Sequence, residues 1–250
     1  MLSHLRHWSH QLAVHLPSML PSSCALCGMT GDKTLCDGCE AQFFKRTAVR
    51  CVRCAIPLPP SGPSPIRHCG ECLKKAPAFD ATVVAADYTA PIDQMVLALK
   101  FGSRLALAPL FARLLRDAVL HAQTDPVTLP SVLTAVPLGA DRLAERGFNQ
   151  SLEMAKPLAR ALGVRLDPTL ALRTRNTQAQ ARLHPDERKK NIRHAFIVSP
   201  HAIDGLRGQH VGVVDDVMTT GETLNELAAT LKRYGAVRVT NLVFARTLQK

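Results

Sequence analysis

Short apolar runs alternate with amphipathic stretches over the C-terminal two thirds of the chain. The runs have the length and the β-branched content of buried strands, and they lie at residues 82–88, 132–137, 196–199, 211–214 and 237–244. Apolar residues recur at helical spacing in the intervening stretches 91–101, 105–121, 151–162 and 222–234, and Gly163 and Gly235 are placed to end two of these helices. Strands that alternate with helices are typical of an α/β domain with a Rossmann-like parallel sheet.

The stretch 211–223 reads V-G-V-V-D-D-V-M-T-T-G-E-T. Its Val-rich strand is predicted to end at the adjacent carboxylates Asp215 and Asp216. A turn rich in hydroxyl groups then leads into a helix, and it contains Thr219, Thr220, Gly221 and Thr223. A helix N-terminus offers unpaired N–H groups to a phosphate, whereas paired carboxylates suit a sugar diol or Mg²⁺. The pattern therefore predicts a site for a sugar phosphate, with an ordinary strand-to-helix turn as the alternative.

All eight cysteines fall into four C-x-x-C pairs, namely Cys24/Cys27, Cys36/Cys39, Cys51/Cys54 and Cys69/Cys72. Two such pairs complete a tetrahedral Cys₄ site, so the spacing predicts two structural Zn²⁺ ions with no open position for catalysis. Disulfides are the alternative, and they are disfavoured in a reducing compartment. Sequential pairing of the four motifs is favoured over interleaved pairing, because short loops close at a smaller entropic cost.

The 250 residues suffice for one α/β domain and a small module. We expect an amphipathic leader at 1–23, a double zinc ribbon at 24–75 and the α/β domain at 76–250. The leader is not expected to be a signal peptide, because four histidines interrupt its apolar residues, and packing on its own protein is favoured over a membrane or partner contact. No apolar run reaches the roughly 18 residues of a membrane span, and we expect a cytoplasmic protein.

Basic residues are concentrated in two predicted loops. The formal charge is +11, and between 141 and 195 twelve Lys and Arg residues oppose six Asp and Glu residues. Loop 137–150 follows a strand and contains Arg142 and Arg146, and loop 173–196 is long, polar and contains Arg175. The carboxyl ends of strands are where open α/β sheets bind ligands, so these arginines are candidates for a polyanion site. A solvated basic face is the alternative.

The motif at 214–223 resembles the phosphoribosyl pyrophosphate (PRPP) motif of type I phosphoribosyltransferases. In chain order, the cysteine pairs precede L-K-F, V-P-L with R-G-F-N-Q, R-T-R-N-T-Q-A-Q-A-R-L, and V-D-D-V-M-T-T-G. This order resembles the ComF family over about residues 20 to 247. The resemblance implies a type I phosphoribosyltransferase fold with an N-terminal zinc ribbon. It also implies that Asp215 and Asp216 hold the ribose hydroxyls, that the loop 219–223 cradles the 5′-phosphate, and that Arg142, Arg146 and Arg175 neutralise pyrophosphate.

The resemblance further implies a role in natural transformation, in which single-stranded DNA is handled in the cytoplasm. The expected ligands are PRPP with Mg²⁺ or a ribose 5-phosphate, and the expected partners are DNA and a competence helicase or other DNA-processing proteins. Two alternatives stay open. One is an active phosphoribosyltransferase, a glycosyltransferase, on an unidentified small acceptor, and the other is a regulator that senses PRPP without turnover.

Overall fold

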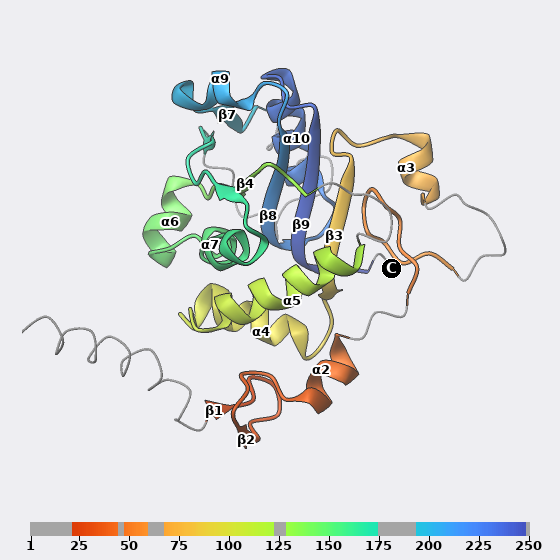
Figure 1. The fold of residues 1–250 in the computed structure, drawn as a ribbon, viewed down its shortest axis with the longest axis vertical. Coiled ribbons are helices and arrows are strands. Elements are labelled where there is room, and N and C mark those ends of the chain that lie inside the picture. Colours follow the sequence, from red (N-terminus) through yellow and green to blue (C-terminus); the bar gives the residue numbers. More distant parts are fainter. Residues whose placement is uncertain (1–21, 45–47, 60–67, 123–128, 175–193, 249–250) are drawn as a thin grey trace, which may run out of the picture. The chain divides into compact units, whose positions relative to one another are not determined.

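Figure 1 shows the computed structural model, which describes residues 22–44, 48–59, 68–122, 129–174 and 194–248. Contacts between residues divide the chain into two compact units, residues 1–45 and 46–250. The predicted leader lies almost entirely outside the described residues. No helix in the described ranges is both long and apolar enough to cross a bilayer.

The larger unit is built on a five-stranded sheet in which all neighbouring strands are parallel. Its strand order is β3 (Ala81–Asp87), β9 (Arg238–Arg246), β8 (His210–Met218), β4 (Val132–Ala135) and β5 (Arg165–Leu166). The two longest strands, β8 and β9, are central and almost fully buried, as their apolar composition requires. The predicted α/β fold with a parallel sheet is confirmed.

Helices cover both faces of this sheet (Figure 1). On one face lie α4 (Ile92–Phe101), α5 (Leu107–Ala122) and α7 (Gln150–Leu162), and Phe111 of α5 stacks on Phe244 of β9 with 3.6 Å between ring centroids. Val243 belongs instead to the core that Leu227 of α10 (Glu222–Arg233) helps to form. Because successive strand residues point to opposite faces, α10 covers the other side.

Three features differ from the sequence-based expectation. Strand β8 continues to Met218, so the carboxylate pair lies within the strand and not after its end. Helix α6 (Ala140–Arg146) occupies part of the predicted loop 137–150. The short strand β6 (Ala171–Arg173) pairs antiparallel with β7 (Phe196–Val198), outside the main sheet, and the short helices η3 (Pro200–Ala202) and α9 (Ile203–Leu206) follow β7.

The two cysteine groups fall in different compact units. The first lies with β1 (Ser22–Ser23), β2 (Thr30–Gly31) and α2 (Asp37–Phe43), and the second lies in the larger unit with α3 (Gly70–Lys74). The backbone N–H of Thr82 in β3 donates to the carbonyl of Val52 at 2.9 Å, and Ala55 is buried in the α10-side core. The second half of the predicted 24–75 module is therefore joined to the sheet domain.

Candidate functional site

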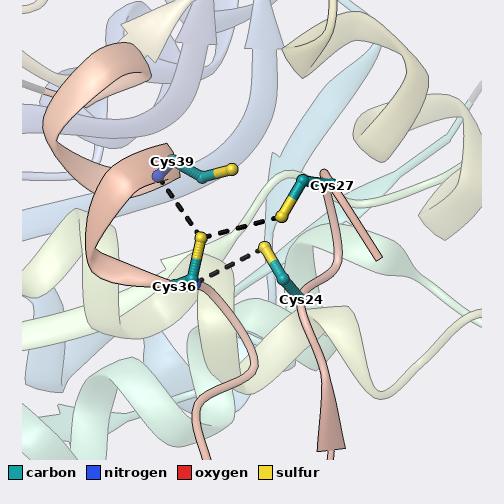
Figure 2. A group of neighbouring side chains, drawn as sticks. All are labelled: Cys24, Cys27, Cys36 and Cys39. Carbon is teal, nitrogen blue, oxygen red and sulfur yellow. Dashed lines mark hydrogen bonds between the residues drawn. The ribbon is translucent and has the colours of Figure 1, made fainter. Parts of the chain in front are cut away.

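The cysteines form two clusters of four, and each cluster combines consecutive motifs. Cys24, Cys27, Cys36 and Cys39 make up the first cluster (Figure 2), and Cys51, Cys54, Cys69 and Cys72 make up the second. Within each cluster all sulfur atoms lie within 4.8 Å of one another. The Sγ atoms of Cys27 and Cys36 are 3.7 Å apart, and those of Cys54 and Cys69 are 3.5 Å apart. A tetrahedron of Zn–S bonds of about 2.3 Å has edges of about 3.8 Å, so both clusters fit Zn²⁺.

Electrostatics within the clusters also favour a cation. In the first cluster, the backbone N–H groups of Cys36 and Cys39 point at the sulfurs of Cys24 and Cys36, at 3.4 Å and 3.5 Å. In the second, burial and the neighbouring Cys69 and Cys51 raise the pKa of Cys54 to about 11. Four adjacent thiolates repel one another, and a bound Zn²⁺ removes that penalty. The membership of the two clusters shows that the four C-x-x-C motifs pair sequentially.

A separate cavity of about 270 Å³ opens at the carboxyl edge of the sheet. It is lined by eight residues that the sequence singled out, namely Arg142, Arg146, Asp215, Asp216, Thr219, Thr220, Gly221 and Thr223. A more open depression of about 410 Å³ lies between α7 and β5, and no carboxylate lines it. The predicted residues of the phosphoribosyl site thus lie together in the cavity that has paired acids.

The loop between β8 and α10 has the backbone shape that an anion cradle needs. Gly221 immediately precedes α10 and has a φ of +83°, which side-chain-bearing residues rarely adopt. A Cβ at this position would lie 2.5 Å from the terminal methyl of Met218. The twelve-residue helix that follows directs its first N–H groups toward the loop, so partial positive charge faces the cavity.

The two carboxylates have different surroundings. Asp216 is 3% exposed, and the Nζ of Lys100 in α4 lies 2.7 Å from its Oδ2. Asp215 accepts a hydrogen bond from the Oγ of Ser151 at 3.0 Å and another from the N–H of Asp216. Burial and the charge of Asp216 raise the pKa of Asp215 to about 7, although Lys100 and Ser151 oppose the shift. The pair therefore resists carrying two negative charges without a further cation.

Three arginines also line the cavity, namely Arg142, Arg146 and Arg173. Arg146 lies over the ring of Phe101 at 5.1 Å and donates to Gln150. Burial and the nearby Arg142 lower the pKa of Arg173 to about 10, which still leaves it charged at neutral pH. Arg175, the third predicted arginine, lies outside the described residues. Acids and arginines therefore line the same cavity, which suits a ligand with a diol at one end and phosphate at the other.

Sequence reasoning gave no role to Lys100, Ser151, Arg173 or Tyr88, although Lys100, Arg173 and Tyr88 line the cavity and Ser151 bonds Asp215. Lys100 was visible as a basic residue at a helix end, but its contact with Asp216 spans more than a hundred residues. Asn149, which lies in the predicted loop 137–150, caps α7: its Oδ1 accepts the N–H of Ser151 at 3.0 Å. Contacts of this kind depend on the tertiary fold.

Comparison with known proteins agrees with this geometry. Residues 149–250 match the phosphoribosyl transferase domain, and residues 15–73 match the double zinc ribbon domain. The chain thus has a phosphoribosyltransferase-type domain preceded by two zinc-binding Cys₄ sites. It is 36% identical over 233 residues to the DNA utilization protein YhgH of Escherichia coli (strain K12), covering 92% of this chain and 99% of that protein.

Competence protein F of Haemophilus influenzae is 31% identical over 206 residues, which cover 82% of this chain and 87% of that protein. The chain belongs to the ComF family, as its motifs predict. Among solved structures, the glutamine PRPP amidotransferase of B. subtilis has a TM-score of 0.38 at 16% identity, over 58% of this chain and 30% of that one. The purine phosphoribosyltransferase of Pyrococcus horikoshii has a TM-score of 0.29 at 15% identity, over 68% and 89%.

The clusters predict two zinc ions per chain with different structural consequences. Cys27→Ser should lose one zinc and unfold the first ribbon while the sheet domain keeps its melting temperature. The matched change Cys69→Ser should also lose one zinc but lower that melting temperature, because Ala55 and Cys54 pack on the core of the sheet domain. Elemental analysis and thermal unfolding by circular dichroism measure both effects. Zinc-free protein, or disulfides in a thiol titration, would contradict the assignment.

The raised pKa of Asp215 predicts a stability gain in Asp215→Asn. Because its folded-state pKa of about 7 lies above the usual value of 3.8, the folded wild type binds this proton more tightly. Wild-type stability should therefore fall as the pH rises from about 4 to 7, and the variant should lack this component. At pH 8 the variant should be more stable by on the order of 1 kcal/mol. Denaturant unfolding at pH 5 and pH 8 tests this, and a variant less stable at pH 8 would refute it.

Proposed function

We propose that the carboxyl-edge cavity binds PRPP or a ribose 5-phosphate, and that the protein works on single-stranded DNA during its uptake or utilisation. The observation that carries the first part is the placement of Asp215 and Asp216 beside the Gly221 loop in one cavity. Acids at a strand edge accept the two hydroxyls of a ribose, and the loop with the helix N-terminus accepts the 5′-phosphate.

The arginines complete the binding site for a pyrophosphate group. Arg142 and Arg146 belong to one turn of α6, and Arg173 ends β6, so three guanidinium groups converge from two elements. We propose that Arg175, two residues farther along the chain, joins them. Mg²⁺ bound with PRPP would supply positive charge to the carboxylate pair. Lys100 forms an ion pair with Asp216, and it would neutralise this carboxylate both without Mg²⁺ and together with it.

Such a pocket could serve either phosphoribosyl transfer or the sensing of PRPP without a reaction. In a transfer reaction the bond between C1 of the ribose and the pyrophosphate oxygen breaks and pyrophosphate leaves, while C1 forms a bond to the acceptor, which releases a proton to solvent. Arginines that stabilise the departing pyrophosphate would lower the barrier without any nucleophilic side chain. A PRPP-sensing regulator would use the same contacts for binding alone. Calorimetry with PRPP and Mg²⁺, followed by an acceptor screen for pyrophosphate release, separates the two.

The DNA part of the proposal is supported by the names of two relatives, a DNA utilization protein and a competence protein. The net charge of +11 suits a polyanion, and eight bound thiolates with two Zn²⁺ leave it at +7. Phe101 is 69% exposed beneath Arg146, and a base can stack on such a ring. With aromatic residues at 4% of the chain, we expect mainly electrostatic binding. A helicase or another DNA-processing protein is the expected partner.

The ribose assignment predicts that Asp215→Asn with Asp216→Asn abolishes binding of PRPP and ribose 5-phosphate while the fold is kept. Two acceptors for the ribose hydroxyls are weakened, and the negative charge that Mg²⁺ needs is lost. Calorimetry measures the affinity, and Asp204→Asn, at an exposed acid in α9, is the control. A double variant that binds as tightly as wild type would show that the ribose lies elsewhere.

The DNA assignment predicts salt-sensitive, sequence-blind binding of oligonucleotides. The logarithm of the affinity should fall with the logarithm of salt concentration by about 0.7 per phosphate neutralised. Arg142→Ala with Arg146→Ala should weaken binding about three- to tenfold, reduce this slope by one to two, and leave base preference unchanged.

The matched control for this test is Arg160→Ala with Arg165→Ala. It removes the same charge beside the other depression, where Arg165 begins the edge strand β5. Fluorescence anisotropy over a salt series measures both pairs. Binding that ignores salt, or an equal loss in the control, would exclude these arginines as the DNA contact.

A further inference from the structure

A single buried arginine connects the second cysteine cluster to the phosphate loop. Arg246 ends β9 and is 2% exposed. Its Nε donates to the carbonyl of Cys54, a member of the cluster, at 3.0 Å. Its Nη1 donates to the carbonyl of Met218 at 3.1 Å and to that of Thr219. These two carbonyls open the loop that contains Gly221, so one planar guanidinium spans both sites.

The buried positive charge of Arg246 needs a negative partner, and the second cysteine cluster can provide it. Among the ion pairs of the described residues, none includes Arg246, although a buried guanidinium needs a nearby negative charge. Burial lowers the pKa of Arg246, and the neighbouring Cys54, Cys69 and Cys72 oppose this shift by favouring the charged guanidinium. Four thiolates around one Zn²⁺ carry a net charge of −2, so the zinc-loaded cluster is the counter-charge that Arg246 has.

A second contact fixes the same cluster to the neighbouring strand. Arg50 forms an ion pair with Asp87 at the end of β3, at 2.9 Å, and also donates to the carbonyl of Ala55 at 3.0 Å. The next residue, Tyr88, lines the cavity, and its N–H donates to the carbonyl of Arg246 at 2.7 Å. The loop 50–55 therefore touches the carboxyl edge at two strands, and of the two arginines Arg50 and Arg246 it is Arg246 that contacts the phosphate loop.

We propose that Arg246 is a positioning residue through which zinc in the second cluster sets the shape of the phosphate loop. The inference rests on the proposed function, because it takes the loop 219–223 as the phosphate site. Coupling between two sites is reciprocal: if zinc improves ligand binding, ligand must improve zinc binding by the same factor. The first cluster lies in the other compact unit and serves as an internal control.

The linkage is tested by measuring the equilibrium zinc affinity of the full chain by competition with a chelator, with and without ribose 5-phosphate. This probe needs no Mg²⁺, which a chelator would also bind. In wild type the ligand should raise the affinity of one of the two zinc sites by about fivefold or more. Cys27→Ser, which retains only the second site, should show the same gain. Arg246→Lys should lose it, because an ammonium does not reproduce the planar fork that reaches both carbonyls.

Arg50→Lys is the matched control, since it weakens the contact with Asp87 and leaves the phosphate loop untouched. It should keep the linkage. Hydrogen exchange gives a readout without ligand: amides in 219–223 should exchange faster in Arg246→Lys and in Cys69→Ser than in wild type or Cys27→Ser. If Cys69→Ser does not fold, Arg246→Lys still decides this comparison.

The outcomes separate the two proposals. A wild type that binds no ribose 5-phosphate refutes the sugar-phosphate pocket, and the exchange data then decide the role of Arg246 alone. A wild type that binds the ligand without any change in zinc affinity, together with unchanged exchange in Arg246→Lys, overturns the positioning role and leaves the pocket intact. Equal linkage at both zinc sites also overturns it, because the coupling would then not pass through Arg246.

Discussion

The carboxylate pair in β8 is the constraint on which the carboxyl edge of this domain depends. Two adjacent acids that are mostly withdrawn from water destabilise the fold unless other groups offset their charge. The fold supplies Lys100 from α4 to Asp216 and Ser151 from α7 to Asp215, at 2.7 Å and 3.0 Å. Helices α4 and α7 are thus each joined to β8 by a polar contact. A residual unfavourable charge remains, and the raised pKa of Asp215 reports it. An acid in this environment lowers the stability of the fold at neutral pH, as expected for a residue whose role is not structural.

Most of the architecture could be predicted from the sequence because it depends on local patterns. The Val-rich runs predicted nearly all strands of the parallel sheet. The glycines predicted helix ends, and Gly163 does end α7 in the left-handed conformation. The predicted phosphate loop and both arginines of α6 line one cavity. The predicted end of β8 was wrong. Parallel pairing with β9 extends the strand to Met218, past polar residues that would end an isolated strand. Pairing partners are not visible in a single run of residues.

The contacts that tune the site could not be predicted, because each joins residues far apart in the chain. Lys100 and Asp216 meet only when the fold brings the end of α4 to β8, and Arg246 reaches Cys54 across 192 positions. The same limit applies to the zinc ribbons. Spacing alone predicts two similar modules, yet the second contributes Ala55 to the core of the sheet domain, and the first lies in a separate compact unit. Two motifs with the same metal chemistry thus have unequal structural roles.

The charges of the cavity also distinguish the two proposed ligands. The acids repel any phosphate that is not accompanied by a cation, so the backbone of a single DNA strand would avoid Asp215 and Asp216. A sugar phosphate with Mg²⁺ offsets that repulsion, and it needs both the acids and the Gly221 loop. Arg142 and Arg146 favour either ligand, and the exposed ring of Phe101 lies next to Arg146. On the proposed function, DNA and PRPP therefore share the arginines of α6 but not the carboxylates. Competition between them would then be partial, and substitution of the acids would weaken sugar-phosphate binding while leaving DNA binding unchanged or stronger.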